Sequence, residues 1–161
     1  MILGLSVAAF TQLHTIISLI GIATGLVFLV ALLRGRWLGG WNLAFLVFTI
    51  LTSVTGFFFP SKVIGPPHVV GMISLVDLAI ALAALYAFKR AGAWRTVYTV
   101  TAIIALYFNV FVGVVQAFQK VRFLNAFAPT GTEPAFVIVQ GLVLIAFIAA
   151  GVLAVRRPAS R

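Results

Sequence analysis

The sequence predicts an all-α fold: an integral membrane bundle of five transmembrane helices, forming a single domain over residues 1–161. Hydrophobic residues make up 63% of the chain and charged residues only 8%, against about 25% charged residues in a typical soluble domain. A soluble fold of this length could not bury so much apolar surface, so we expect lipid to be the solvent. Five separate apolar runs each reach roughly the 20 residues that a helix needs to cross a bilayer.

Short basic or proline-containing segments separate the predicted spans. The spans cover residues 10–33, 41–59, 67–88, 96–118 and 134–155. The first, third and fifth end at basic clusters, the second ends at Pro60, and the fourth ends at the sequence QKVR. Short links favour antiparallel neighbours in a compact bundle. The only sizeable predicted loop is NAFAPTGTEP, residues 125–134, which contains the breakers proline and glycine.

The loop charges predict how the chain lies in the membrane. One side would hold eight basic residues, and the other would hold three basic residues and one glutamate. The first set is Arg34, Arg36, Lys89, Arg90, Arg95, Arg156, Arg157 and Arg161, and the second is Lys62, Lys120, Arg122 and Glu133. Because cytoplasmic loops carry an excess of Lys and Arg, we expect a bacterial inner-membrane protein with its N-terminus outside and its C-terminus inside.

The same charge pattern bears on the expected partners. The net charge of +9 is gathered at loop positions, where basic clusters report membrane orientation rather than nucleic-acid binding. The expected partners are therefore the lipid bilayer and either further copies of the chain or a larger membrane complex, and no nucleic acid.

The first four spans show a weak internal repeat. His14 is followed 20 residues later by Arg34, and His68 is followed 21 residues later by Lys89. Each of these spans ends in a basic turn that carries tryptophan, and a returning helix follows. The pattern is typical of two hairpins in a parallel repeat plus one further helix. Any two hairpins of like orientation also share basic turns, so duplication and coincidence are both open.

His14 and His68 are the only histidines, and we expect both at the same depth near the external interface. Imidazole is a common metal ligand and an axial ligand of haem iron. Gly21 and Gly25 lie on the His14 face and Gly71 lies one turn beyond His68, which would leave room for a flat ring. The pair therefore predicts a cofactor site for haem b or a quinone. The alternative is that each histidine caps its helix end or reaches to the headgroups.

Asp77 is the only acidic residue inside a predicted span. An ionised carboxylate there costs several kcal/mol unless it is paired or hydrated, which makes Asp77 a candidate for proton or cation handling. It lies nine residues after His68, about half a turn around the helix, so the two side chains belong to separate environments. The alternative is a protonated or hydrogen-bonded carboxyl at a helix contact.

Three more polar residues are expected near the external end: Gln116, Glu133 and Gln140. With the two histidines they would form one external polar cluster. Polar stripes of this kind also mark the interior of a bundle, where interhelical hydrogen bonds contribute about 0.6 kcal/mol each. No carboxylate–histidine cluster appears at ligand spacing and the chain has no cysteine, so no metal is predicted beyond haem iron at the two histidines.

The stretches SVTGFFFP (53–60), PPHVVGMISL (66–75) and ALYFNVFVGVVQAF (105–118), with TEP before the last span, resemble a family of small uncharacterised bacterial inner-membrane proteins. The resemblance covers most of the chain as a general pattern. It implies a multi-pass bundle and carries over no activity. The chain is also loosely similar to membrane b-type cytochromes, which are small helical bundles with histidines near one face. Two histidines allow at most one bis-histidine haem.

The sequence supports three functional interpretations. The first is a small redox module that holds a b-type haem or a quinone at His14 and His68. The second is a small oligomeric transporter or channel for protons, ions or a small solute, which would use Asp77 and the polar stripe of the fourth span. The third is an accessory or structural subunit of a membrane complex. The common hydrolase, nucleotide-binding and metalloprotease motifs do not occur, so the sequence does not indicate an enzymatic reaction.

Overall fold

The computed structural model describes residues 1–60 and 65–157 as an all-α bundle. The helices in chain order are α1 (Val7–Leu33), α2 (Gly39–Gly56), α3 (Pro66–Leu82), the π-helical turn η1 (Ala83–Ala87), α4 (Trp94–Lys120), the short α5 (Arg122–Asn125) and α6 (Pro134–Arg156). Lys62 and Arg161, which entered the charge count, lie outside the described residues.

Five helices are long and apolar enough to cross a membrane: α1, α2, α3 together with η1, α4 and α6. The prediction of a multi-pass, all-α membrane bundle is therefore confirmed. The predicted boundaries differ from the observed ones by a few residues. The first helix begins earlier because the Ser6 hydroxyl caps it by accepting a hydrogen bond from Ala9 N at 3.1 Å. The second ends at Gly56 and not at residue 59.

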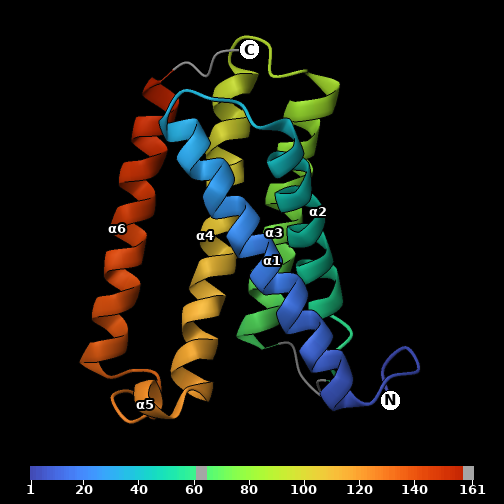
Figure 1. Ribbon diagram of the computed structural model, residues 1–161, viewed down its shortest axis with the longest axis vertical. Coiled ribbons are helices and arrows are strands. Elements are labelled where there is room, and N and C mark those ends of the chain that lie inside the picture. The colour runs from blue at the N-terminus through green and yellow to red at the C-terminus, as the bar shows by residue number, and fades with distance from the viewer. Residues whose placement is uncertain (61–64, 158–161) are drawn as a thin grey trace.

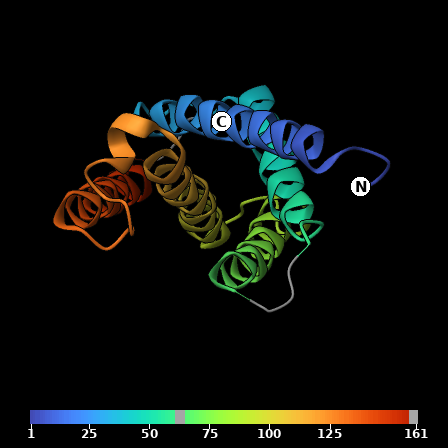
Figure 2. The same ribbon diagram turned by 90° about the horizontal axis from the view of Figure 1, so that it is seen from below.

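The helices pack as a bundle with α6 at its edge. In Figure 1, α1 runs obliquely across the bundle, and it contacts α2, α4 and α6. Viewed along the bundle, α4 lies between α6 and α3 (Figure 2). The α3 helix packs against α2 and α4, and among the described residues it makes no contact with α1.

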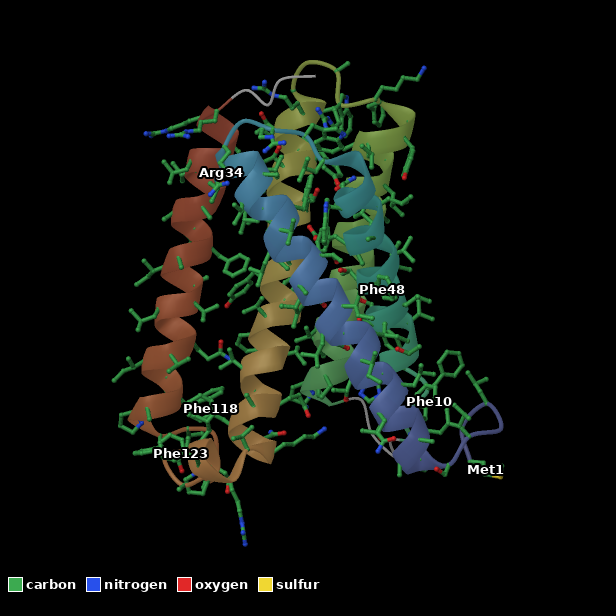
Figure 3. All side chains as sticks on the ribbon, viewed as in Figure 1. Met1, Phe10, Arg34, Phe48, Phe118 and Phe123 are labelled. Atoms are coloured by element: carbon green, nitrogen blue, oxygen red, sulfur yellow. The ribbon has the colours of Figure 1, made fainter. Side chains whose placement is uncertain are left out.

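The two ends of the bundle differ in charge, and we name them by their residues. The arginine-rich end holds the following described basic residues: Arg34, Arg36, Lys89, Arg90, Arg95, Arg156 and Arg157. The histidine end holds His14, His68, Lys120, Arg122 and Glu133. Figure 3 shows Arg34 at the first end and Phe10 and Phe118 toward the second.

The hydrophobic core lies mainly between α1, α2, α3 and α4, and Ala154 of α6 joins it. Its largest members include Phe28, Phe45, Leu46, Tyr98 and Leu106, all of which are almost fully enclosed. In contrast, α6 buries only two side chains, Gln140 and Ala154. Most of the apolar surface of α6 is therefore left to face lipid, as expected for a helix whose solvent is hydrocarbon.

Candidate functional site

His14 is held against α2. Its Nδ1 lies 2.7 Å from Thr55 Oγ1, and its ring packs edge-on against Phe59 with centroids 5.2 Å apart. The Thr55 hydroxyl donates its hydrogen to Leu51 O at 2.6 Å, so it can only accept from the imidazole. The His14 proton consequently lies on Nδ1, and in the neutral ring the lone pair on Nε2 is available to a ligand.

His68 caps the start of α3. Gly65 N donates a hydrogen bond to His68 Nδ1 at 3.3 Å, and Phe57 packs beside the ring with centroids 6.1 Å apart. Pro66 and Pro67 begin the helix, because proline is favoured where backbone N–H groups have no helical partner. The capping interpretation is therefore confirmed for His68. Because Nδ1 accepts here, the neutral ring carries its proton on Nε2, and that nitrogen cannot ligate a metal in this state.

The two histidines lie at the same end of the bundle but have separate surroundings. His14 bonds to α2, whereas His68 bonds to the residue that precedes its own helix. Their helices do not touch within the part of the chain that the structure describes, and both pack against α2. A shared ligand would have to lie between them.

Protein atoms occupy the space beside Gly21, Gly25 and Gly71, where the sequence predicted room for a flat cofactor ring. A Cβ atom on Gly25 would lie 2.5 Å from Leu106 Cδ1 and 2.7 Å from Phe45 Cδ2. A Cβ atom on Gly71 would lie 3.0 Å from Phe57 Cζ. A Cβ atom on Gly21 would lie 3.5 Å from the Phe48 backbone carbon of α2. These glycines therefore let helices and aromatic rings approach closely, and do not leave the room for a flat cofactor ring that the sequence suggested.

Asp77 lies in the middle of α3 on its buried face. The side chain is 9% exposed, and its Oδ2 atom is enclosed without a hydrogen-bond partner. The buried face of α3 can only meet α2 and α4, because these are the two long helices against which α3 packs. Asp77 also forms no ion pair with any described basic residue. Among the described residues it is thus an acidic group inside the bundle whose Oδ2 atom has no partner.

Two polar pairs join α4 to α2 along the same contact. The Tyr98 hydroxyl donates to Asn42 Oδ1, and Asn109 Nδ2 donates to Thr49 Oγ1 at 2.9 Å. Ser53 and Ser74 are buried on α2 and α3. We call the contact of α2, α3 and α4, with these polar side chains and Asp77, the polar seam. Tyr98 and Asn42 lie 56 residues apart in the chain, so the sequence gave no sign that they pair.

The other three predicted site residues share no hydrogen-bond partner among the described residues. Glu133 Oε1 accepts from Thr130 N at 3.0 Å and from the Thr130 hydroxyl at 2.9 Å, and Oε2 accepts from Thr132 N at 3.0 Å. These bonds lower the pKa of Glu133 to about 2, and the bond from the Thr130 backbone contributes most. Gln140 Nε2 donates to Phe111 O at 3.1 Å, and Gln116 is exposed.

Four of the five residues predicted for the external cluster thus have hydrogen-bond partners of their own, and Gln116 is exposed. No hydrogen bond in the described structure joins any two of His14, His68, Gln116, Glu133 and Gln140. Glu133 organises the loop that precedes α6, and Gln140 links α6 to α4. No group of three or more His, Asp or Glu that could hold a metal ion occurs among the described residues.

Comparisons with known proteins add nothing to these observations, because no protein family, curated protein sequence or solved structure matches the chain. The functional assignment therefore depends on the chemistry of the described side chains.

Proposed function

We propose that the protein is a small membrane transporter or channel that moves protons or a small cation along the polar seam. Asp77 would be the group that takes up the proton or cation. One observation carries the proposal: Asp77 is 9% exposed, and its Oδ2 atom is buried without a hydrogen-bond partner.

This observation favours a function for Asp77 because burying a charge is costly. An ionised carboxylate in a membrane span costs several kcal/mol unless a proton, a cation or a hydrogen-bond donor neutralises it. A helix contact that served packing alone would be more stable with an apolar residue or a paired one. The unpartnered oxygen of Asp77 is suited to exchange a proton or a cation, and the polar groups on α2 and α4 supply further ligands along the seam.

The test is ion flux into liposomes that contain the purified protein. We expect wild-type protein to carry protons, Na⁺ or K⁺ above the rate of empty liposomes, and Asp77→Asn to lose this flux, because the amide keeps the shape but cannot ionise. Glu133→Gln is the matched control, since it makes the same change at the only other acidic side chain, outside the seam. It should transport normally.

Two results would overturn the proposal. One is equal flux in wild type and Asp77→Asn, once circular dichroism and gel filtration show that both are folded. The other is wild-type flux no higher than that of empty liposomes for all three ions. The second result would favour an accessory or structural subunit.

The sequence also predicted a haem-binding redox module, and this interpretation has a separate test. His14 Nε2 is free to bind a ligand, but His68 would have to release its bond to Gly65 N before its Nε2 could bind iron. We therefore expect the purified protein to show no Soret band in its absorption spectrum. A Soret band that disappears in both His14→Ala and His68→Ala would instead establish bis-histidine haem.

We further propose that the arginine-rich end faces the cytoplasm of a bacterial inner membrane. Seven described basic residues at that end support this, against two at the histidine end, by the rule that Lys and Arg concentrate in cytoplasmic loops. A reporter enzyme that is active only in the periplasm, fused to the C-terminus, should give no activity. Strong activity would show that the C-terminus lies in the periplasm and would contradict the proposed orientation.

A further inference from the structure

Three arginine side chains line a narrow cleft at the arginine-rich end. Arg90 comes from the turn after η1, Arg95 from the start of α4, and Arg157 from the end of α6. Thr96 and Thr99 of α4 line the same cleft. The cleft is small, about 10 Å³, so an anion larger than water would lie at its mouth.

The fold holds Arg90 in place at some cost. Lys89 and Arg90 both adopt left-handed backbone conformations, with φ of 49° and 55°, which cost about 1–2 kcal/mol each for residues other than glycine. This turn lays the Arg90 guanidinium over the Trp37 ring, 3.5 Å from its centroid. Burial lowers the pKa of Arg90, and the neighbouring charge of Arg95 adds to that effect.

No acidic side chain balances these charges. The chain has only two acidic residues: Asp77 lies inside α3, and Glu133 is bonded within its own loop at the opposite end. Arg157 Nη1 donates to Leu33 O at 2.9 Å, and Arg95 makes no side-chain hydrogen bond within the described structure. Guanidinium donors are therefore left for an anion, and their planar fork suits phosphate.

An apolar groove adjoins this cleft. It runs between α4 and α6, has a volume of about 260 Å³ and shares Thr96 and Val155 with the cleft. Val100, Gly151 and Val152 line the rest of it, with Arg156 at its edge. A Cβ atom on Gly151 would meet nothing closer than Ile103 Cγ2 at 4.0 Å, so glycine keeps the floor of the groove open.

We propose that the arginine cleft and the α4–α6 groove together bind one acidic phospholipid. The phosphate would lie at the mouth of the cleft against Arg95 and Arg157, and an acyl chain would lie in the groove. Charge complementarity selects this occupant, because basic pockets between transmembrane helices are typical sites for acidic headgroups. Free phosphate is also an anion but would occupy only the cleft. Binding in the groove therefore distinguishes a phospholipid from free phosphate.

The charge arm of the test uses native mass spectrometry of delipidated protein with phosphatidylglycerol or phosphatidylcholine of matched acyl chains. We expect Arg95→Gln/Arg157→Gln to weaken phosphatidylglycerol binding about tenfold or more and to leave phosphatidylcholine binding unchanged. The control is Arg34→Gln/Arg36→Gln, which removes the same charge at the same end but outside the cleft. An equal loss in both pairs would show a diffuse surface attraction and overturn the site.

The groove arm compares two glycines of α6. Gly151→Leu should fill the groove and weaken phosphatidylglycerol binding, whereas Gly141→Leu, which meets nothing within 4 Å, should not. Inorganic phosphate at millimolar concentration should displace phosphatidylglycerol poorly. If Gly151→Leu binds the lipid like wild type, or if inorganic phosphate displaces it readily, the site recognises phosphate alone and the lipid proposal fails. Gel filtration of each variant establishes that it is folded.

Discussion

The α4 helix has different surroundings on its two sides, with α2 and α3 on one side and α6 on the other. Toward α2 it forms two side-chain hydrogen bonds, from Tyr98 to Asn42 and from Asn109 to Thr49. Toward α6 it receives one, from Gln140 to a backbone carbonyl. The first contact belongs to the enclosed core, whereas α6 exposes most of its surface.

Each contact contains one buried oxygen atom without a partner, and we propose a functional role for only one of them. Asp77 and Gln140 are each 9% exposed, and the two atoms are Asp77 Oδ2 and Gln140 Oε1. Gln140 is neutral, and its amide nitrogen is bonded to Phe111 O. Asp77 can carry a charge and has no such bond. Burial alone therefore does not make a residue a site candidate, whereas burial of an ionisable group without a partner makes Asp77 the stronger candidate of the two.

Replacing a glycine by leucine should produce the largest difference in the free energy of unfolding between the core and the α4–α6 contact. In the core, the new Cβ at Gly25 would lie 2.5 Å from Leu106 Cδ1 and 2.7 Å from Phe45 Cδ2. Both of these side chains are almost fully enclosed and cannot move aside. Overpacking of this kind costs about 1–3 kcal/mol, and we expect Gly25→Leu to reach the upper end of that range. Unfolding by sodium dodecyl sulfate, followed by circular dichroism, measures the loss.

The control is Gly141→Leu in α6, where a new side chain meets open space. It should change the free energy of unfolding by less than about 0.5 kcal/mol, as surface substitutions usually do. Equal losses at Gly25 and Gly141 would mean that α6 packs as tightly as the core, which would contradict the comparison.

The helices could be predicted from the sequence because their signals are local. Apolar runs, basic ends and breakers such as Pro60 and Pro134 lie within the segments that they define. The short helix α5 was missed because four residues, Arg122–Asn125, are too few to show a periodic pattern. The interior position of Thr49 and Asn109 was also predictable, because a polar residue in a span avoids lipid.

The site was only partly predictable because it depends on contacts between distant segments. Asp77 was recognised from its charge and depth, both of which are local. The matched depth of His14 and His68 suggested a shared ligand, but depth does not fix which way each ring points. The Thr55 hydroxyl and Gly65 N determine the ring bonds.

The contacts of the glycines were also only partly predictable from the sequence. A small residue predicts a close approach, but the sequence does not say what approaches. At Gly71 it is the Phe57 ring, and at Gly25 it is Phe45 and Leu106. The segment GIATG, residues 21–25, fits the GxxxG pattern of close helix contacts, and a Cβ atom on Gly21 would lie 3.5 Å from the Phe48 backbone carbon of α2.

We expect a smaller difference in the free energy of unfolding when the hydrogen bonds of the α4–α2 contact and of the α4–α6 contact are removed. Tyr98→Phe keeps the ring and deletes the hydroxyl, which leaves Asn42 Oδ1 without its donor in a residue that is 3% exposed. An orphaned buried acceptor costs about 1–3 kcal/mol. We expect a loss of about 1 kcal/mol, since interhelical hydrogen bonds in membranes average about 0.6 kcal/mol.

Gln140→Leu should cost less than Tyr98→Phe. It removes the bond to Phe111 O, but that carbonyl lies inside α4, where the helix supplies its own donor. It also removes the unpartnered Oε1 atom, and leucine is favourable in a membrane-spanning helix. The two effects oppose each other, so the free energy of unfolding in the same detergent titration should change by less than about 0.6 kcal/mol. If Gln140→Leu cost more than Tyr98→Phe, the α4–α6 contact would be the more strongly bonded one, and the low burial of α6 would no longer indicate weak attachment.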